Sequence, residues 1–443
     1  MNDTIYALAS GHGTAGVAVI RVSGPRANYV LLKISSEPIP KPRLASLRRL
    51  RDIETGRDID DALVIWFPGP ASFTGEDIVE FHAHGGTAVI NEIFSAISGI
   101  ESCRMANPGE FTRRAFENRK LDLTSAEAVA DLVAAETTEQ RRLALAQYDG
   151  ALANLYDGWR TKLTEILANT EVMIDFSDEE IPDDLNLTNK HNILYIKKII
   201  TQYIDDGRMG ERIRTGFRVA IIGEPNVGKS SLLNKISGRE AAIVSKTKGT
   251  TRDIIEVHIQ LGGYAVIIAD TAGLRETQDE VESEGVRRAQ KLAEDADMKL
   301  VIFDATNFPN IDDMSKRYLD GNSIAVFNKV DIIKKPVRFE INAHEIFSIS
   351  ALTGEGLDSL LAFLQEKIQM RLQYAENPPL TRARHREALE AVVEALGRAE
   401  NAVLPELQAE DLRLANRALA RITGRVDVED VLDVIFMDFC IGK

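Results

Sequence analysis

Residues 223–230 read Gly-Glu-Pro-Asn-Val-Gly-Lys-Ser, which fits the G-x-x-x-x-G-K-[ST] pattern of a phosphate-binding loop. Glycines let the backbone N–H groups of such a loop turn towards phosphate oxygens. Lys229 is placed to reach the β- and γ-phosphates of a nucleotide, and Ser230 is placed to bind Mg²⁺. An apolar, β-rich run at 217–222 precedes the loop and a helix-like run at 231–236 follows it. This strand–loop–helix order indicates a nucleotide site rather than a chance glycine-rich loop.

Three later segments follow in the order of a guanine-nucleotide site: 270–273 (Asp-Thr-Ala-Gly), 328–331 (Asn-Lys-Val-Asp) and 350–352 (Ser-Ala-Leu). Asp270 ends a predicted strand, where it can hold the Mg²⁺ shell, and the Gly273 N–H can sense the γ-phosphate. Asp331 can accept both guanine N–H donors, which selects guanine because adenine lacks the exocyclic 2-amino group. The whole set resembles the translation-factor-related GTPase superfamily.

The residues for hydrolysis differ from those of Ras-like enzymes, which place a Gln after the Asp-x-x-Gly segment to orient the attacking water. Here that position is Leu274, which cannot do so. Glu282 is our candidate general base or water-orienting group. The alternative is that Glu282 is one more solvated acid, and sequence alone favours that alternative.

The segment 245–251 should lie over the phosphates, with Thr250 or Thr251 completing the Mg²⁺ shell. Asn226 adds a side-chain carbonyl near the α-phosphate, which could ligate a monovalent cation that takes the place of an arginine finger. The expected GTP contacts are Asn226, Val227, Gly228, Lys229, Ser230, Ser231, Ser245, Lys246, Thr247, Lys248, Gly249, Thr250, Thr251, Asp270, Thr271, Ala272, Gly273, Asn328, Lys329, Asp331, Ser350, Ala351 and Leu352.

The composition favours a cytoplasmic enzyme of several domains. The 443 residues exceed what one hydrophobic core usually holds, so we expect two or three domains. No apolar run of membrane-spanning length occurs, and residues 1–10 carry acidic Asp3 without a basic region, unlike a secretory signal. The two cysteines, Cys103 and Cys440, do not suggest a disulfide framework. A net charge of −15 argues against sequence-blind nucleic-acid binding by the whole surface.

Periodicity divides the chain into differently patterned segments. Short β-branched runs punctuated by Gly and Pro mark residues 1–118 as mixed α/β. Helical spacing begins at Thr124, where Thr124 and Glu127 fit a capping box, and it continues to about residue 213. Strand-like runs alternate with helix-like segments from 217 to about 372, which is typical of a parallel sheet covered by helices, and the tail from 381 is again helical.

We therefore predict a multi-domain α/β protein. An N-terminal α+β domain precedes an all-helical central domain, and a Ras-like P-loop GTPase domain is inserted into the helical one. The expected boundaries are 1–118 for the N-terminal domain, 119–214 and 376–443 for the two helical parts, and 215–375 for the GTPase domain.

Motifs along the whole chain resemble the MnmE (TrmE) family of bacterial tRNA-modification GTPases. Matching runs lie at 20–24, 74–77 continuing through Glu80 to 84–86, 108–116, 225–234, 249–253, 270–273, 279–282 and 439–443. The GTPase motifs are widely shared, whereas the N-terminal runs and the Cys-x-Gly-Lys end are far more specific. Arg119 departs from the family pattern, which has Gly at that position.

The resemblance implies a homodimer that acts with an FAD-dependent MnmG (GidA)-type partner, as a heterotetramer. Together they would add a carboxymethylaminomethyl or aminomethyl group to C5 of the wobble uridine, position 34, of certain tRNAs. The implied cofactors are GTP/GDP, Mg²⁺, K⁺ and a tetrahydrofolate derivative in the 5,10-methylene or 5-formyl form, bound by the N-terminal domain, which also dimerises. Hydrolysis would depend on potassium and on pairing of the GTPase domains.

Site residues carried over by the same motifs have four roles. Arg21, Glu80, Lys120 and Lys443 would contact the folate. Asn226, Ser245, Thr247 and Thr250 would hold K⁺, Ser230 and Thr251 would hold Mg²⁺, and Glu282 would be catalytic.

Several alternatives stay open. His82 and His84 alternate with Glu80 on a predicted strand, which allows a metal site, but two histidines without a third ligand more often line a pocket. Cys440 is either a small buried side chain or a nucleophile. The protein as a whole could instead be a ribosome-assembly switch of the Era or Der type, or a regulator whose flanking domains are a passive scaffold.

Overall fold

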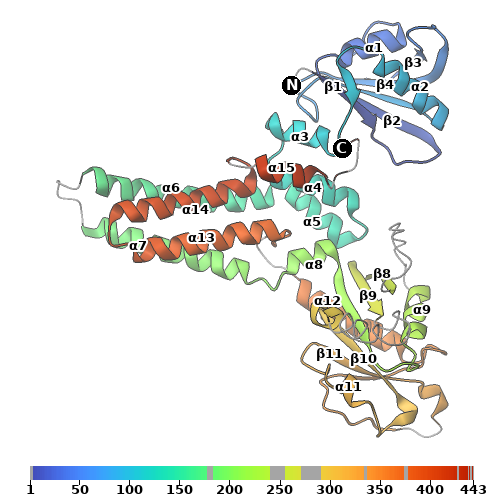
Figure 1. Ribbon diagram of the computed structural model, residues 1–443, viewed down its shortest axis with the longest axis vertical. Helices are drawn as coiled ribbons and strands as arrows, with labels where there is room; N and C mark the ends of the chain where they lie inside the picture. Colours follow the sequence, from blue (N-terminus) through green and yellow to red (C-terminus); the bar gives the residue numbers. More distant parts are fainter. Residues whose placement is uncertain are drawn as a thin grey trace, which may run out of the picture. The chain divides into compact units, whose positions relative to one another are not determined.

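The computed structural model describes residues 3–176, 183–239, 255–270, 291–333, 337–373, 378–426, 429–437, 439 and 442. Its contacts divide the chain into two compact units. The first comprises Met1–Ala130, Gln147–Lys197 and Ala391–Lys443, and the second comprises Asp131–Ala146 and Lys198–Glu390. Each unit thus combines segments that lie far apart in the sequence (Figure 1).

The first unit contains a six-stranded sheet of order β3-β4-β5-β2-β1-β6 (Figure 1). Its elements are β1 (Thr4–Leu8), β2 (Ala15–Ser23), α1 (Ala27–Ser35), β3 (Ser46–Arg51), β4 (Asp58–Phe67), β5 (Ile78–Gly85), α2 (Thr87–Ser98), β6 (Cys103–Met105) and α3 (Glu110–Glu117). Neighbouring strands are antiparallel except β1 and β6. Side chains such as Ile20, Val64 and Phe81 pack against α1 and α2 on one face. Because side chains alternate along a strand, Arg21 and Glu80 belong to the other face.

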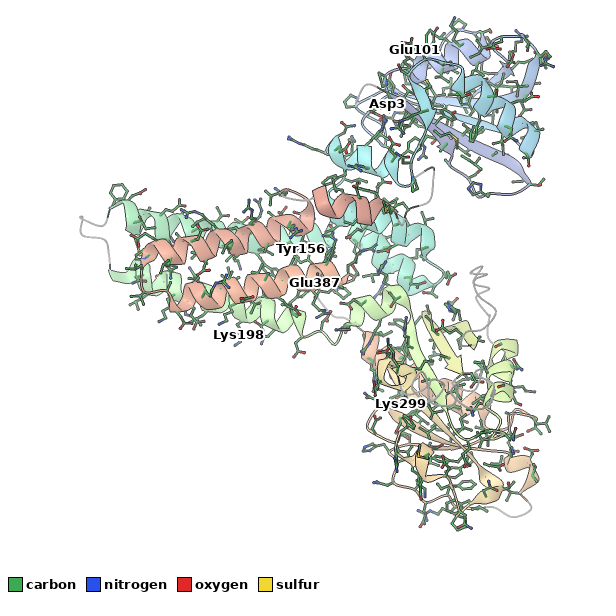
Figure 2. All side chains as sticks on the ribbon, viewed as in Figure 1. Asp3, Glu101, Tyr156, Lys198, Lys299 and Glu387 are labelled. Carbon is green, nitrogen blue, oxygen red and sulfur yellow. The ribbon has the colours of Figure 1, made fainter. Side chains whose placement is uncertain are left out.

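The helical part of the first unit is built by packing between distant segments. The helices that lie wholly or mostly in it are α4 (Leu123–Ala134), α6 (Ala151–Asp175), α7 (Asp183–Ile204), α13 (Ala383–Asn401), α14 (Pro405–Thr423) and α15 (Glu429–Met437). Helices α6 and α14 lie side by side, with Tyr156 of α6 only 1% exposed (Figure 2). Buried hydrogen bonds of Thr170 to Gln408 and of Asn189 to Thr170 join α6 to α14 and α7.

The start of α4 corrects one sequence prediction. The helix begins at Leu123, and the Asp122 carboxylate caps it by accepting the backbone N–H of Thr124 at 2.8 Å and of Ser125 at 3.1 Å. The Thr124 hydroxyl donates to the same carboxylate instead of capping the helix. The predicted capping box is therefore wrong by two residues, because Asp122 is a strong N-cap that precedes it.

The second unit contains the other six-stranded sheet, of order β12-β11-β10-β7-β9-β8 (Figure 1). Its elements are α5 (Thr138–Tyr148), α8 (Met209–Thr215), β7 (Phe217–Ile222), α9 (Lys229–Arg239), β8 (Ile255–Leu261), β9 (Tyr264–Asp270), β10 (Met298–Asp304), η1 (Ala305–Asn307), α11 (Asp313–Lys316), β11 (Ser323–Asn328), η2 (Val330–Ile332), β12 (Ile346–Ser348) and α12 (Leu357–Leu372). Apolar strand residues pack with α9 and α12 in one large core. The fold class predicted from the sequence, α/β with a largely parallel sheet and many helices, is confirmed.

Strand β8 was not predicted, and it is the one antiparallel strand in this sheet among the residues that the structure describes. It joins β9 through Gly262 and Gly263, whose φ angles are +59° and +91°. Two consecutive residues with positive φ form the tight turn that suits antiparallel strands. The Gly-Gly pair between alternating apolar residues was the available signal.

Candidate functional site

The phosphate-binding motif lies between β7 and α9, at the end of a central parallel strand. Its backbone takes left-handed angles at Asn226, φ +63°, and at Gly228, φ +100°. A Cβ atom at Gly228 would lie 2.2 Å from Asn328 Nδ2, so that only glycine fits there. The motif glycine therefore permits close contact with Asn328, the last residue of β11.

Lys229 is buried inside this loop. Its Nζ donates hydrogen bonds to the carbonyl oxygens of Gly223 at 2.7 Å and Glu224 at 2.8 Å. Burial lowers the pKa of Lys229, while the nearby carboxylates of Asp270 and Glu224 oppose that shift. The ammonium group is thus held where backbone N–H groups and a helix N-terminus favour a phosphate.

Ser230, the second residue of α9, contacts Asp270, the last residue of β9. The Ser230 hydroxyl donates to Asp270 Oδ2 at 2.8 Å, and Asp270 is 1% exposed. Strand pairing places Asp270 beside Ile221, at the end of β7. A hydroxyl and a carboxylate are hard oxygen ligands of the kind that Mg²⁺ prefers, so this pair fits a magnesium site.

Asn328 connects the phosphate loop to the base-side segments. Its Nδ2 donates to the Val227 carbonyl at 2.8 Å, and its Oδ1 accepts the Ala351 N–H at 2.9 Å. The side chain is 2% exposed. Asn328 therefore connects residues of three predicted segments, 223–230, 328–331 and 350–352.

The other base-side residues surround this bridge. Lys329 has φ +70°, and its Nζ contacts Asp304 Oδ2 at 2.6 Å. Asp331 is exposed in η2, whereas Ser350 is fully buried. Leu352 is an exposed apolar side chain. An exposed carboxylate at Asp331, three residues after the fixed Asn328 amide, fits the Asn-Lys-x-Asp pattern expected for guanine selection.

Many predicted residues lie outside the described part of the chain. These are Ser245, Lys246, Thr247, Lys248, Gly249, Thr250, Thr251, Thr271, Ala272, Gly273, Glu282, Cys440 and Lys443. Asn226 and Ser231 are described, and both are exposed.

The N-terminal sheet carries a second polar site. Arg21 on β2 is the register partner of Glu80 on β5. The guanidinium Nε donates to Glu80 Oε1 at 3.0 Å, and Nη2 lies 2.8 Å from the same oxygen in an ion pair. His82 Nε2 lies 3.3 Å from Glu80 Oε2, whereas His84 Nδ1 lies 2.7 Å from Asp60 Oδ1. No group of three or more His, Cys, Asp or Glu side chains in the described residues could hold a metal ion, so the two histidines do not build one there.

Two aromatic residues that the sequence analysis missed contact Arg21. The guanidinium carbon lies 5.7 Å from the Phe73 ring centre and 5.8 Å from the Phe111 ring centre. Phe111 belongs to the small core that includes Ile5 and Ala7 of β1, and Phe73 packs against that core. Lys120 Nζ donates to the Pro70 carbonyl at 3.1 Å, in the same loop as Phe73. Phe73 adjoins the family-like run 74–77, and Phe111 lies within the run 108–116. Those runs were the one signal in the sequence that pointed to these two rings.

The donor set of this second site suits a folate. A carboxylate such as Glu80 can accept N–H groups of a pterin ring, and cations such as Arg21 and Lys120 can pair with glutamyl carboxylates. The rings of Phe73 and Phe111 add flat apolar surface beside these charges.

The strand–loop–helix, the Ser230–Asp270 contact and the Asn328 bridge define the class of this protein as a P-loop GTPase with an α+β domain and a helical part. Residues 4–120 match the family model of the GTP-binding protein TrmE N-terminus, and residues 123–440 match that of the MnmE helical domain. The chain belongs to the MnmE (TrmE) family of tRNA modification GTPases.

Two relatives illustrate the extent of the similarity. A tRNA modification GTPase MnmE of Paramagnetospirillum magneticum is 51% identical over 443 residues and 100% of both chains. One of Parvibaculum lavamentivorans is 50% identical over 447 residues, again over 100% of both chains. Among solved structures, the G domain of the T. maritima FeoB iron transporter is 27% identical, with a TM-score of 0.25, and the match covers 35% of this chain and 99% of that one. Within the described residues, no helix has the length and apolar character needed to cross a membrane.

Proposed function

We propose that this protein hydrolyses GTP during tRNA modification, and that with an FAD-dependent MnmG (GidA)-type partner it adds a carboxymethylaminomethyl or aminomethyl group to C5 of the wobble uridine at position 34. One observation carries the proposal: a complete phosphate loop and a charged, aromatic-lined site of folate-binding character occur in one chain whose whole length matches MnmE relatives. This activity would place the protein in the cytoplasm.

The nucleotide would be held by the residues that already meet in the GTPase domain. Lys229 would exchange its loop carbonyl partners for the β- and γ-phosphates. Ser230, with Thr251, would hold Mg²⁺, which supplies charge neutralisation to the phosphates. Asp331 would select guanine, Asn328 would keep the phosphate loop and the 350–352 segment in register, and the remaining predicted contacts would complete the pocket.

Hydrolysis would use a monovalent cation in place of an arginine finger. Asn226 has a left-handed backbone conformation and an exposed side chain, which would provide one oxygen ligand for K⁺. Ser245, Thr247 and Thr250 would provide the other ligands. Glu282 would orient the attacking water because Leu274 cannot. Closure of the site by a second GTPase domain would couple hydrolysis to dimerisation.

The one-carbon donor would bind in the N-terminal domain as a 5,10-methylene- or 5-formyl-tetrahydrofolate. Glu80 would accept pterin N–H donors, and Arg21, Lys120 and Lys443 would hold the polar and anionic parts of the ligand. Dimerisation of residues 1–118 is supported by exposed Leu47 and Leu63, which are register partners on β3 and β4.

The proposed domain plan assigns 1–118 to folate binding and dimerisation, 119–214 and 376–443 to the helical domain, and 215–375 to GTP hydrolysis. The homodimer would assemble with its partner protein as a heterotetramer that receives tRNA.

The test is a nucleoside profile of wobble uridines from cells that lack this protein, complemented with the unsubstituted chain, Lys229→Ala or Arg21→Ala. We expect the modified wobble uridines to disappear without the protein and to return only with the unsubstituted chain. Wobble uridines that stay modified in its absence would overturn the proposal and favour a ribosome-assembly switch of the Era or Der type.

A further inference from the structure

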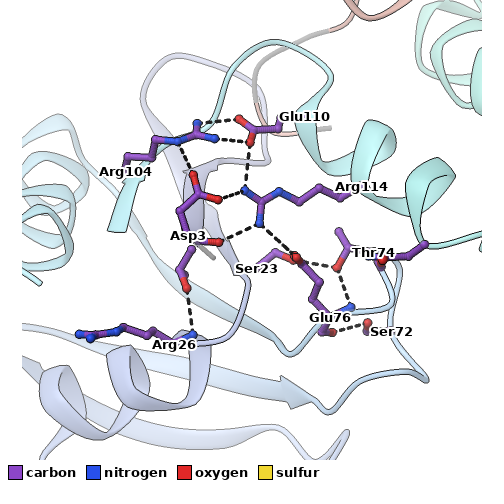
Figure 3. Close-up of polar contacts among 11 residues, drawn as sticks. Asp3, Ser23, Arg26, Ser72, Thr74, Glu76, Arg104, Glu110 and Arg114 are labelled. Atoms are coloured by element: carbon purple, nitrogen blue, oxygen red, sulfur yellow. Dashed lines mark hydrogen bonds and ion pairs between the residues drawn. The ribbon is translucent and has the colours of Figure 1, made fainter. Parts of the chain in front are cut away.

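Arg114 on α3 is 1% exposed, yet its guanidinium joins three separate segments of the N-terminal domain (Figure 3). Nη1 donates to the Asp3 carbonyl at 3.0 Å and to both Glu76 carboxylate oxygens at 3.2 Å. Nη2 donates to Asp3 Oδ1 at 2.9 Å and to Glu110 Oε1 at 3.1 Å. A buried guanidinium with this many directed bonds fixes the geometry of every group that it contacts.

A second arginine completes the network. Arg104 donates to Asp3 Oδ2 at 2.6 Å and to the two Glu110 oxygens at 2.8 and 2.6 Å. Three carboxylates therefore share two guanidinium groups (Figure 3). Arg114 and Glu110 are the buried members, at 1% and 8% side-chain exposure, so removing a partner of either leaves a buried charge unmatched.

Glu76 extends the network into the loop at 69–77. Its Oε2 accepts the Ser23 hydroxyl at 2.8 Å, and the Ser23 and Thr74 hydroxyl oxygens lie 2.7 Å apart. Asn118 Nδ2 donates to the Thr74 carbonyl at 2.7 Å. The loop is thereby tied to β2 and to the residue that follows α3, through Thr74 and Glu76 directly after Phe73.

The two aromatic residues that contact Arg21 come from two of the three segments that Arg114 joins. Phe73 lies in the loop anchored through Glu76, and Phe111 lies on α3, three residues before Arg114. On a helix, residues three apart stand on the same side. The same loop also contains Pro70, whose carbonyl accepts the Lys120 ammonium.

We propose that Arg114 is a positioning residue for the folate site: by fixing the 69–77 loop through Glu76 and by fixing α3, it sets Phe73 and Phe111 against the Arg21 guanidinium. Arg114 does not touch the ligand. Arg114 acts by orienting Arg21, and Arg21 in turn holds the Glu80 carboxylate in position to accept hydrogen bonds from the ligand. This inference rests on the proposed folate function of the N-terminal domain.

The experiment titrates full-length protein calorimetrically with 5-formyl-tetrahydrofolate. Arg114→Lys keeps the charge but loses the planar fork of donors, and Glu76→Gln removes the charge that anchors the loop. We expect each to weaken binding about tenfold while GTP turnover is retained. Arg113→Lys is the matched control, because Arg113 is the next residue on α3 and pairs instead with Glu117 and Asp433. That control should bind folate as the unsubstituted chain does.

A double-substitution cycle distinguishes positioning from general stability. If Arg114 acts through Arg21, Arg114→Lys should weaken binding much less in an Arg21→Lys background than alone. Equal effects in both backgrounds would overturn the inference. Should Arg114→Lys fail to fold, Glu76→Gln in the same two backgrounds decides the question.

The outcomes also distinguish a failure of the Arg114 role from a failure of the proposed folate function. An unsubstituted protein that does not bind 5-formyl-tetrahydrofolate would end both the folate proposal and the role of Arg114. Binding by the unsubstituted chain that Arg114→Lys and Glu76→Gln leave unchanged would end the role of Arg114 alone.

Discussion

Arg21 and Glu80 stand directly opposite each other on the antiparallel strands β2 and β5, and two nitrogens of the guanidinium, Nε and Nη2, lie 3.0 and 2.8 Å from one carboxylate oxygen of Glu80. The pair is partly accessible to solvent: the Arg21 side chain is 20% exposed and the Glu80 side chain is 16% exposed. A carboxylate oriented in this way keeps its second oxygen available to another donor, and in this structure that oxygen lies near His82.

The first prediction concerns this pair. Arg21→Ala should weaken 5-formyl-tetrahydrofolate binding by about 10- to 100-fold, because it removes a cation and releases Glu80 from its orientation. Calorimetric titration of the full-length protein measures the change. Arg49→Ala is the control, since Arg49 forms exposed ion pairs with Asp58 and Asp61 on the same sheet. Unchanged affinity in Arg21→Ala would remove Arg21 from the folate site.

The second prediction concerns the monovalent cation. GTP turnover should be much faster in potassium than in sodium at matched ionic strength, and Asn226→Gly should abolish the difference. Glycine accepts the φ of +63° at this position without strain, so the substitution removes the side-chain oxygen alone. Phosphate release under saturating GTP measures the rates. Equal rates in the two salts for the unsubstituted protein would contradict the potassium mechanism.

The third prediction concerns the catalytic residue. Glu282→Ala should lower GTP turnover by at least ~100-fold while nucleotide affinity stays close to that of the unsubstituted chain, because an orienting base acts on the water and not on the nucleotide. Single-turnover hydrolysis and nucleotide titration separate the two quantities. Glu280→Ala, which changes a neighbouring acid, should leave both unchanged. Turnover that survives in Glu282→Ala would assign the role elsewhere.

The fourth prediction is a pH dependence of stability. Burial alone would raise the pKa of Glu110, but hydrogen bonds from Arg104, the Asn107 N–H and Arg114 leave it below the ordinary value of 4.5. The pKa of Asp3 is lowered for the same kind of reason, against its own burial. A carboxylate whose folded pKa is depressed stabilises the fold above its ordinary pKa, and that contribution is lost as the pH falls through the depressed value.

Arg104→Ala should therefore lower the melting temperature by roughly 2–4 °C at pH 7. The difference from the unsubstituted chain should begin to shrink below about pH 4.5, where the carboxylates of the unfolded chain take up protons. It should vanish once the pH has fallen through the depressed pKa values of Glu110 and Asp3 in the folded chain. Melting curves between pH 7 and pH 3 test this, with Arg113→Ala as a neighbouring control. A difference that stays constant across this range would mean that these ion pairs do not stabilise the fold.

The sequence predicted those features that local pattern encodes. The strand before Gly223 and the strand ending at Asp270 follow from short apolar runs, and their motifs have fixed spacing. Where two local signals compete, as Asp122 and Thr124 do for one helix start, pattern alone selected the wrong residue. Apolar periodicity alone does not predict β8, although the Gly262-Gly263 pair marks its turn locally.

The network around Arg114 could not have been predicted in this way. Its partners Glu76 and Asp3 lie 38 and 111 residues away along the chain. No periodicity or spacing relates residues so separated, because their meeting depends on how β1, the 69–77 loop and α3 fold together. The roles of Phe73 and Phe111 depend on the same tertiary arrangement.

The pairing of α6 with α14 has a consequence for how the protein is made. The bond between Thr170 and Gln408 joins residues 238 positions apart, with the entire GTPase domain synthesised between them. At roughly 5–20 residues per second, a ribosome needs on the order of tens of seconds to produce α14 after α6 has emerged. During that interval α6 lacks α14, one of the helices against which it packs in the folded protein. The GTPase domain can complete its own core first, so the helical part should be the last to become stable and the most dependent on chaperones during synthesis.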